Sequence, residues 1–338
     1  MNKKTIGVAL LGCGNVGSGT FRVLTENAGI IAKRAGADVR VKAILVRDLC
    51  KDRDAGIPKD LLTDDFSAIL DNPEIDIVAE LMGGLEPAVS YMKQALQAGK
   101  HVVSANKAAL ARSGEELTKN AGAQGLMLRY EAAVCGAIPV MNAISTALAA
   151  NEITGIRGIL NGTTNYILTR MDEDNAPYAA VLKDAQDKGF AEADPTGDVE
   201  GHDAANKLTL LIAAGFGRYI RPDDIEREGI TGVTEDDLRK AAAENAKIKL
   251  VATAVREKDG IRARVRPEFL PADHPLSSVR NEFNAVLISC NMADDIFLQG
   301  RGAGPLPTGS AVAGDILEIA ACIARGTEKN ALPTWRLQ

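Results

Sequence analysis

Short apolar runs alternate with amphipathic segments over the first 130 residues of the chain. The apolar runs are bounded by glycine or polar residues, which is typical of buried strands. They predict strands at 6–11, 39–46, 75–81, 101–104 and 126–130. Helical spacing of apolar residues predicts helices at 17–33, 66–72, 87–98 and 110–123. Strands that alternate with helices in this order predict a parallel sheet with right-handed crossovers.

The pattern changes after Pro139, where strands and helices no longer alternate one by one. Helices are predicted at 140–150, 164–172, 178–188, 202–214 and 310–324, and strands at 155–160, 247–255, 261–267 and 285–290. The predicted fold class is therefore α/β, with a Rossmann-type parallel sheet and a second α+β domain that holds a mixed or antiparallel sheet. We place the domains at 1–135 and 136–309, with a C-terminal helix at 310–338 that returns to the first domain.

Composition excludes several classes of protein. A net charge of −6 argues against a general nucleic-acid binder. No stretch of 18 uncharged apolar residues exists, which argues against a membrane span, and Gly12 breaks the first apolar run too early for a secretory signal. Five scattered cysteines without a CxxC pair indicate reduced thiols in a cytoplasmic protein and no zinc site.

A glycine-rich turn follows the first predicted strand and precedes the first helix. Gly12, Gly14 and Gly17 fit the GxGxxG dinucleotide fingerprint. The first glycine permits a tight turn, the second lets the backbone approach a pyrophosphate, and the third lets the helix pack on the strand. Amide groups at the helix N-terminus then face the phosphates. We therefore predict that this loop, including Asn15 and Val16, binds a nicotinamide dinucleotide; a purely structural turn is the alternative.

The end of the second strand bears on the choice between NADP and NAD. An acidic residue there usually holds the ribose 2′-hydroxyl of NAD, whereas an arginine accommodates the 2′-phosphate of NADP. In this chain Arg47 comes first and Asp48 follows. We predict NADP, bound through Arg47. The alternative is NAD bound through Asp48, with Arg47 as a solvated charge.

Four ionisable residues follow one another closely in the second half of the chain: Glu192, Asp198, Asp203 and Lys207. Asp203 and Lys207 are four residues apart on a predicted helix and share a face. They form either an ordinary surface ion pair or part of a cleft, and the otherwise apolar segment 204–214 favours the cleft. Converging carboxylates suit a substrate with an ammonium group. A partly desolvated lysine suits proton transfer to a carbonyl oxygen as a hydride arrives.

Two further features lie at the ends of predicted strands. Lys107 follows the fourth strand, at the sheet end where ligands of open α/β folds bind, so a role toward substrate or cofactor is favoured over a surface cation. Residues 160–165 form a turn into a helix, with Thr163 or Thr164 as its cap. The exposed amides of that turn could also bind a carboxylate, and both alternatives stay open.

Six segments in order resemble homoserine dehydrogenases, along nearly the whole chain. They lie at 7–17, 80–84, 99–107, 130–134, 160–167 and 192–207. Such a series is more specific than a dinucleotide fingerprint alone. The resemblance implies NAD(P)-dependent interconversion of L-homoserine and L-aspartate 4-semialdehyde, on the route to threonine, isoleucine and methionine. It also implies that the first domain binds the dinucleotide and that the second is the catalytic and dimerisation domain.

The resemblance implies roles for individual residues. Lys207 is expected to protonate the aldehyde oxygen in reduction, and Lys107 to be a second essential lysine near nicotinamide and substrate. Substrate binding is expected at Glu192, Asp198, Asp203, Gly162, Thr163 and Gly189. Cofactor binding is expected at Gly12, Gly14, Asn15, Val16, Gly17, Arg47, Gly83, Lys107 and Gly302.

A structural sodium ion and a homodimer are further implications of the resemblance. The ion is expected largely on backbone carbonyls, at Glu131, Val134, Gly136 and Ile138. The dimer is expected through the sheet of the second domain. Ser104 stands where the family usually has threonine, which keeps the hydroxyl. Phe190 stands where it often has tyrosine, so any hydrogen bond from that ring is lost.

Other expectations concern regulation, partners and rival functions. Many relatives carry an ACT-type regulatory module after the last helix or a kinase domain before the first strand. We expect neither here, and therefore no threonine feedback. The expected partner is a small-molecule substrate, without nucleic acid or membrane. A different NAD(P)-dependent amino-acid or semialdehyde reductase would not need Glu192, Asp198 and Lys207 together. A non-catalytic redox sensor would lack the paired lysines, and no cysteine stands beside a base as a covalent aldehyde dehydrogenase requires.

Overall fold

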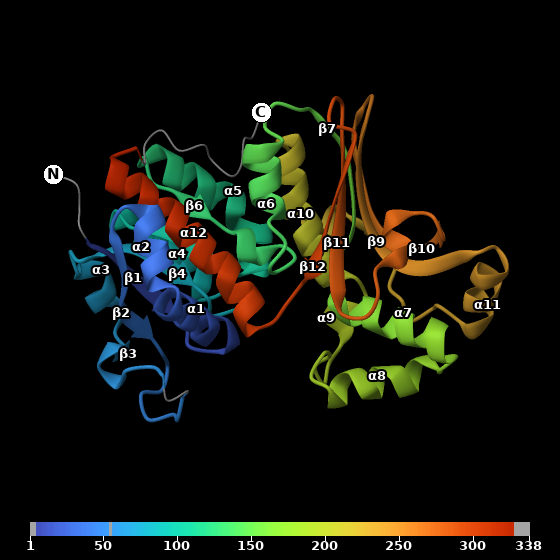
Figure 1. Cartoon of the computed structure of the whole chain (residues 1–338), viewed down its shortest axis with the longest axis horizontal. Helices are drawn as coiled ribbons and strands as arrows, with labels where there is room; N and C mark the ends of the chain where they lie inside the picture. The colour runs from blue at the N-terminus through green and yellow to red at the C-terminus, as the bar shows by residue number, and fades with distance from the viewer. Residues whose placement is uncertain (1–4, 54–55, 328–338) are drawn as a thin grey trace. The chain divides into compact units, whose positions relative to one another are not determined.

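A computed structural model describes residues 5–53 and 56–327 of the 338-residue chain (Figure 1). The described chain divides into two compact units. The first runs to Pro139 and takes in the segment from Ala303 onward, and the second runs from Val140 to Gly302. The first unit thus extends slightly beyond residue 135, and its returning segment begins before residue 310. Part of the predicted C-terminal segment, residues 328–338, lies outside the described residues.

Six parallel strands form the sheet of the first unit, in the order β3-β2-β1-β4-β5-β6. They are β1 (Thr5–Leu11), β2 (Asp38–Leu45), β3 (Leu62–Thr63), β4 (Ile75–Glu80), β5 (His101–Ser104) and β6 (Leu128–Arg129). The strand order reverses between β1 and β4, and ligands of open α/β sheets bind at the carboxyl ends beside such a reversal. The predicted parallel sheet is confirmed. The missed strand, β3, is too short to show a periodic pattern.

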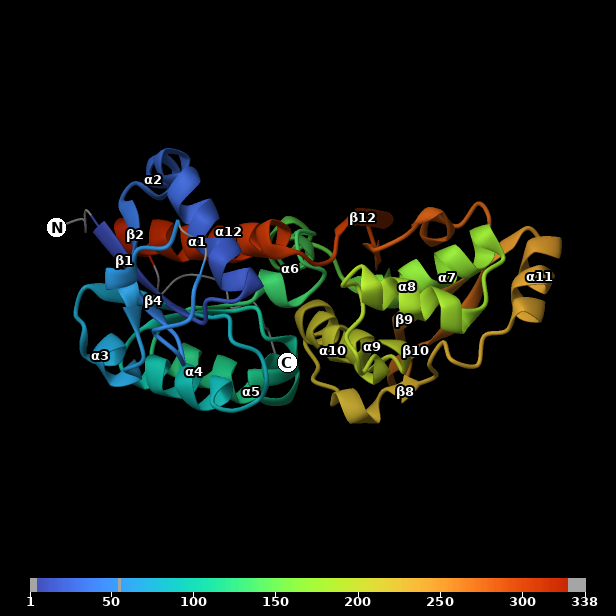
Figure 2. The same ribbon diagram turned by 90° about the horizontal axis from the view of Figure 1, so that it is seen from below.

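Helices cover both faces of this sheet, with α1, α2 and α12 on one face and α4 and α5 on the other (Figure 2). The helices of the unit are α1 (Asn15–Glu26), α2 (Ala28–Ala35), α3 (Phe66–Asp71), α4 (Ala88–Gln97), α5 (Lys107–Ala123) and α12 (Pro305–Arg325), with 3-10 turns η1 (Lys59–Leu61) and η2 (Glu131–Ala133). The single helix predicted at 17–33 is wrong. Asn27 leaves the helical conformation between α1 and α2, at φ −99° and ψ 14°, and asparagine favours such helix ends.

α12 packs against α1 although nearly 300 residues separate them in sequence. A Cβ atom on Gly19 would lie 2.0 Å from the Pro305 carbonyl oxygen, and one on Gly309 would lie 2.6 Å from the backbone of Gly19. Both glycines therefore allow the two helix backbones to approach closely. By length and hydropathy, α12 is the one helix among the described residues that could cross a membrane. Its side chains Val312 and Ile316 are fully buried in the core of the unit, so it is a core helix.

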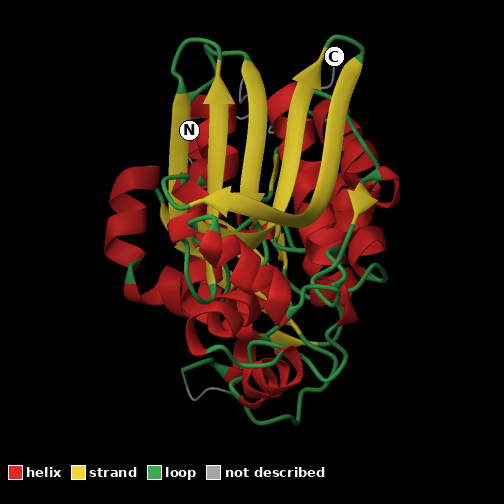
Figure 3. Cartoon of the chain, turned by 90° about the vertical axis from the view of Figure 1, so that its right-hand side faces the viewer, coloured by secondary structure: helices red, strands yellow, loops and turns green. Residues whose placement is uncertain are grey.

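The sheet of the second unit has the order β12-β11-β7-β9-β10-β8, and Figure 3 shows its long strands side by side. Its strands are β7 (Ile153–Ile159), β8 (Glu226–Arg227), β9 (Ala246–Glu257), β10 (Gly260–Pro271), β11 (Phe283–Cys290) and β12 (Asp295–Arg301). All neighbouring pairs are antiparallel except the parallel pair β8 and β10. The predicted second sheet is confirmed as a mixed sheet. Strands β8 and β12 were missed.

The helices of the second unit pack on this sheet and connect its strands. They are α6 (Val140–Asn142), α7 (Gly162–Asp174), α8 (Tyr178–Asp187), α9 (Thr196–Val199), α10 (His202–Phe216) and α11 (Glu235–Ala243), with 3-10 turns η4 (Pro222–Asp224) and η5 (Pro275–Ser278). The helix predicted at 140–150 is confirmed only at 140–147, where the short α6 continues into a π-helical turn, η3 (Ala143–Ala147). The acidic loop before α10 contains α9, which the sequence did not predict.

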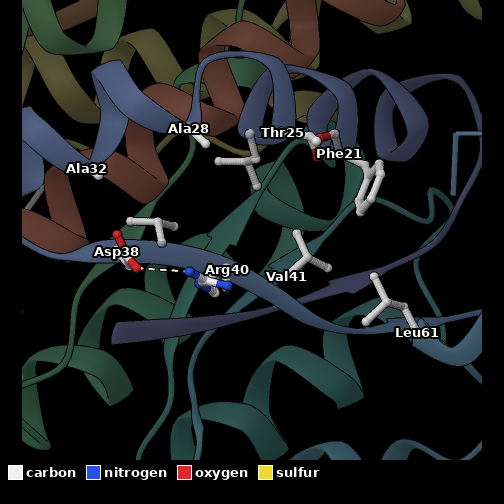
Figure 4. A pocket seen from close by; sticks show the side chains of 10 residues that line it. Phe21, Thr25, Ala28, Ala32, Asp38, Arg40, Val41 and Leu61 are labelled. Carbon is white, nitrogen blue, oxygen red and sulfur yellow. Dashed lines mark hydrogen bonds and ion pairs between the residues drawn. The ribbon is translucent and has the colours of Figure 1, made fainter. Parts of the chain in front are cut away.

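An open pocket of about 390 Å³ lies between α1, α2 and β2 (Figure 4). Its lining is mostly apolar and includes Phe21 and Leu61. Asp38 and Arg40, which also line it, form an ion pair at 3.0 Å. Asp38 is the first residue of β2, so the pocket lies near the amino end of that strand. It is therefore separate from the crevice at the carboxyl ends of the strands.

Candidate functional site

The glycine loop joins β1 to α1 at the carboxyl end of the first sheet. Gly12 has a φ of +108°, and a Cβ atom there would lie 2.9 Å from the Leu81 carbonyl oxygen. A Cβ atom on Gly17 would lie 2.2 Å from the Gly12 carbonyl oxygen. At Gly14, by contrast, a Cβ atom would meet nothing within 4 Å. Gly12 and Gly17 thus allow the turn and the helix packing, while the space beside Gly14 is open for an anion at the helix N-terminus.

Arg47 lies at the same end of the sheet, directly beyond β2, and its side chain is exposed. The Gly12 N–H donates to the Leu45 carbonyl oxygen at 3.0 Å, which ties the glycine loop to the end of β2. Asn15 and Val16 form the first turn of α1. The Asp48 carboxylate accepts from the Cys50 N–H at 2.8 Å and so closes a local turn. Arg47 and Asp48 are both exposed at this end of the sheet, and the local turn uses only one Asp48 oxygen.

A buried carboxylate joins the ends of β4 and β5. Glu80 is fully buried. Its Oε2 accepts from the Ser104 hydroxyl at 2.7 Å, and its Oε1 accepts from the Met82 N–H at 2.9 Å. Ser104 Oγ in turn accepts from the Asn106 N–H at 3.1 Å. The hydroxyl at position 104 thus both donates and accepts, which a threonine hydroxyl can do equally well.

Lys107 is the first residue of α5, at the carboxyl end of β5. The Asn106 side chain caps this helix, because its Oδ1 accepts from the Ala109 N–H at 3.1 Å. Its Nδ2 donates to the Gly84 carbonyl oxygen at 2.7 Å. One side chain therefore fixes both the helix start that carries Lys107 and the turn that contains Gly83, whose φ is +90°. The sequence interpretation missed Asn106 and Glu80 as members of this site.

Asp198, Asp203 and Lys207 meet in the second unit, and we call them the carboxylate–lysine cluster. Lys207 Nζ donates to Asp203 Oδ2 at 2.7 Å and to the Leu160 carbonyl oxygen at 2.6 Å. Asp203 and Lys207 are only 8% and 7% exposed. The pair is therefore buried, unlike an ordinary surface ion pair on a helix.

Asn161 connects the members of this cluster. Its Nδ2 donates to Asp198 Oδ1 at 2.7 Å and to Asp203 Oδ2 at 2.9 Å. Its Oδ1 accepts from the Thr164 N–H and so caps α7. The predicted cap at Thr163 or Thr164 is wrong, because the asparagine one turn earlier takes that place. Thr163 Oγ1 instead lies 3.0 Å from Asp198 Oδ2 and 2.6 Å from the Phe190 carbonyl oxygen.

The charge state of Asp198 depends on its surroundings. Burial and the neighbouring charge of Asp203 raise the pKa of Asp198, and hydrogen bonds from Asn161 and Thr163 oppose that shift. A threonine hydroxyl has one hydrogen, while both neighbours of Thr163 are oxygen acceptors. Thr163 therefore donates its hydrogen to one of these two oxygens at a time. Asn161 and Thr163 are thus the neighbours whose hydrogen bonds favour the ionised form of Asp198.

The remaining predicted residues lie around the ends of α7, α8 and β12. Gly162 is the first residue of α7, and a Cβ atom there would lie 2.7 Å from the Glu282 carbonyl oxygen. Gly189 follows α8 with a φ of +74°. Glu192 is exposed in the loop before α9, and within the described residues nothing bonds its carboxylate to the carboxylate–lysine cluster. Gly302 follows β12, where the neighbouring Asn284 side chain leaves no room for a Cβ atom.

Residues 131–138 form a turn in the first unit after β6. Glu131, Val134 and Ile138 are buried, and the two consecutive residues Cys135 and Gly136 have φ values of +58° and +56°. Such a turn bends the backbone sharply. Among residues 5–53 and 56–327, no group of three or more His, Cys, Asp or Glu side chains could hold a metal ion. An ion at this turn would therefore need backbone carbonyl oxygens as its main ligands.

Two family descriptions match most of the chain between them. The NAD-binding domain of homoserine dehydrogenase matches residues 12–131, and homoserine dehydrogenase matches residues 139–317. A homoserine dehydrogenase of Bacillus subtilis is 40% identical over 327 residues, which cover 97% of this chain and 76% of the relative. One of Mycobacterium tuberculosis (strain H37Rv) is 44% identical over 324 residues, which cover 94% of this chain and 73% of the relative.

Solved structures give the same result. A homoserine dehydrogenase from Thiobacillus denitrificans has a TM-score of 0.94 at 42% identity, over 99% of this chain and 78% of its own. A hyperthermophilic archaeal homoserine dehydrogenase mutant in complex with NADPH has a TM-score of 0.79 at 26% identity, over 93% of this chain and 97% of its own. A different reductase of the same architecture is not favoured. The chain therefore belongs to the homoserine dehydrogenase family, oxidoreductases that act on the CH–OH group of homoserine, and it contains the NAD-binding domain of that family.

Proposed function

We propose that this chain interconverts L-homoserine and L-aspartate 4-semialdehyde in the cytoplasm, for threonine, isoleucine and methionine biosynthesis, with NADP as its preferred cofactor. The buried ion pair of Lys207 and Asp203 on α10, which also bonds the Leu160 carbonyl oxygen just before α7, carries this proposal. The bound nicotinamide supplies a hydride to the aldehyde carbon or accepts one from homoserine. The direct test follows NADPH and NADH consumption with aspartate 4-semialdehyde. Lack of turnover with both cofactors would contradict the proposal.

Lys207 is the proposed acid and base of the reaction. Its ammonium group gives a proton to the aldehyde oxygen during reduction and takes it back during oxidation of homoserine. Asp203 and the Leu160 carbonyl oxygen hold that group by two short hydrogen bonds in a buried environment, where electrostatic interactions are stronger than in water. Lys107, at the N-terminus of α5, is the proposed second lysine, which contacts nicotinamide and substrate.

The substrate carries an ammonium and a carboxylate, and the second unit offers groups for each. Asp198 and Asp203 supply negative charge for the ammonium group. The N-terminus of α7, at Gly162 and Thr163, offers backbone amides for the carboxylate. We propose that Gly189 and Glu192 complete the substrate site from the loop that follows α8.

Arg47→Ala is expected to raise KM for NADPH about tenfold or more, because a hydrogen bond to a charged group contributes about 1.5–3 kcal/mol. KM for NADH is expected to stay unchanged, because NADH has no 2′-phosphate. Initial-rate measurements with both cofactors check this. Arg53→Ala is the matched control, because Arg53 lies in the same loop and donates to the carbonyl oxygens of Lys51 and Asp48. Equal losses for NADPH and NADH, or an equal effect of the control, would contradict the role of Arg47.

We propose a structural sodium ion at the turn that follows β6. It would be held by Glu131, Val134, Gly136 and Ile138, mainly through their carbonyl oxygens. Burial of the turn and a donor set of oxygen atoms support a hard cation there. The chain is expected to melt at a higher temperature in sodium chloride than in tetramethylammonium chloride of equal ionic strength. Equal melting temperatures would argue against the ion.

We propose a homodimer formed through one face of the second sheet. α10 covers the other face, because a Cβ atom on Gly215 of α10 would lie 3.0 Å from the Ile156 side chain of β7. Side chains alternate along a strand, so Arg157 points to the opposite face. Thr253 of β9 pairs with Arg157, and Arg264 of β10 pairs with Thr253. Directly paired residues point to the same face, so all three share it. In Figure 3 no helix of the second unit lies in front of the upper part of these strands.

This face combines buried polar atoms with exposed apolar surface. Thr253 Oγ1 and Arg264 Nε are buried, and neither has a hydrogen-bond partner among the described residues. Val255, two residues after Thr253 on the same face, is 37% exposed. A second copy of the sheet would cover the apolar surface and offer partners to the polar atoms. Sedimentation equilibrium is expected to give twice the mass of the chain, and a monomer at micromolar concentration would argue against the dimer.

A further inference from the structure

Asn161 was not among the predicted site residues, yet both donor hydrogens of its side chain bond carboxylates of the cluster. Its two Nδ2 hydrogens bond Asp198 and Asp203, at 2.7 Å and 2.9 Å. Its Oδ1 accepts from the backbone N–H and the hydroxyl of Thr164, at 2.8 Å and 3.0 Å. The residue is only 4% exposed, so water does not replace these contacts. An asparagine amide offers two donor hydrogens, and both are used here, while its oxygen accepts from the Thr164 N–H.

The start of α7 decides which way this amide points. The helix needs an acceptor for the free N–H groups of its first turn, and Asn161 Oδ1 supplies it at Thr164. The NH₂ group must then face the two carboxylates. A flipped amide would place its oxygen against both negative charges and leave the helix uncapped. The helix start therefore holds two N–H donors between Asp198 and Asp203.

The same segment also holds the lysine. Asp203 Oδ2 accepts from Asn161 and from Lys207 Nζ, so one oxygen atom connects the two side chains. The carbonyl oxygen of Leu160, the residue before Asn161, accepts from Lys207 Nζ as well. A displacement of residues 160–161 would therefore move one acceptor of the lysine ammonium group and break the Asn161 bond to the other.

We propose that Asn161 is a positioning residue for the reaction, which keeps Asp198 and Asp203 ionised side by side and thereby holds Lys207 in place. This inference rests on the proposed roles of the carboxylate–lysine cluster. Two carboxylates close together disfavour each other's ionisation, and N–H donors to both relieve that repulsion. Without the amide, the cluster would retain extra protons. It would then lose negative charge for the substrate ammonium and the fixed partner of the lysine.

Asn161→Ser is the main test. Serine is also a good helix cap, so the start of α7 is retained, but its hydroxyl is too short to reach both carboxylates. We expect kcat/KM for homoserine to fall about tenfold or more, as expected for lost hydrogen bonds to charged groups. The acid limb of the pH profile should move up by about one pH unit, because the carboxylates keep their protons to higher pH. Steady-state homoserine oxidation across the pH range measures both.

A second variant and a control separate positioning from folding. Asn161→Asp keeps the size and the cap but places a third carboxylate in the cluster, so a larger loss and a larger shift of the acid limb are expected. Thr164→Val removes the hydroxyl contact on the capping side and leaves both Nδ2 bonds, so activity and pH profile should stay near wild type. NADPH binding, measured by its fluorescence, should be unchanged in all three, because the glycine loop lies in the other unit.

The outcomes are distinguishable from failure of the proposed function itself. A wild-type rate and pH profile for Asn161→Ser, beside an inactive Lys207→Met variant, would overturn only the role of Asn161. Equal losses in Asn161→Ser and Thr164→Val, without a shift of the acid limb, would assign the effect to the cap and also overturn it. An active Lys207→Met variant would overturn the proposed function of the cluster.

Discussion

Lys207→Met is expected to lower kcat for aspartate 4-semialdehyde reduction by about 10²–10⁴-fold, the usual cost of losing a well-placed proton donor. Lys207 Nζ is held at 2.7 Å by Asp203 and at 2.6 Å by the Leu160 carbonyl oxygen, so the wild-type donor needs little rearrangement. Methionine fills the space of the aliphatic stem without a proton to give. KM for the aldehyde should change less, because its ammonium group is bound by the carboxylates. Stopped-flow and steady-state measurements with NADPH check this.

Loss of the lysine also leaves Asp203 buried without its cation, which can cost about 3–5 kcal/mol of stability. The double variant Lys207→Met with Asp203→Asn removes both charges, and it should regain stability but not activity. A surface pair provides the matched control for the single change. Lys183 and Asp187 are also four residues apart on a helix, but the lysine side chain is 73% exposed. Lys183→Met should leave rate and stability nearly unchanged, whereas a normal rate for folded Lys207→Met would contradict the catalytic role.

Gly14→Ala is expected to weaken NADPH binding about ten- to a hundredfold while the fold stays intact. The backbone at Gly14 has a φ of −87°, which alanine adopts without strain, and no atom lies within 4 Å of the added Cβ. The methyl group instead occupies the space that the pyrophosphate needs, and overpacking typically costs about 1–3 kcal/mol. Titration calorimetry with NADPH and thermal unfolding of the unliganded chain measure the two effects separately.

Gly17→Ala provides the comparison for this prediction. Its Cβ atom would lie 2.2 Å from the Gly12 carbonyl oxygen, so the first turn of α1 must move away from β1. Stability and NADPH binding should therefore both fall, unlike in Gly14→Ala. If the two variants lost stability equally, the space beside Gly14 would not be the open phosphate site that we infer.

The first unit was largely predictable because its signals are local. The alternation of apolar strands with helices is visible within short windows, and the glycine loop follows the first strand directly. Three of the missed elements are too short to show such a pattern: β3 and β8 are two residues long, and α9 has a single turn. The fourth, β12, is a seven-residue edge strand without regular alternation of buried and exposed residues. The returning helix α12 was predicted as a helix, but its close contact with α1 depends on Gly19 and Gly309, which meet only in the folded chain.

The candidate site divides in the same way. Sequence alone determined the cofactor class, from Gly12 to Gly17, and placed Asp203 and Lys207 on one helix face, because spacing within one element is readable. Only the tertiary structure showed that the pair is buried, that Glu192 is exposed, and that Asn161 joins Asp198 to Asp203. Those facts depend on α7 and α10 packing on one sheet, which brings together residues about 40 positions apart. Contacts between distant segments are set by the packing of whole elements, and no local pattern of residues records them.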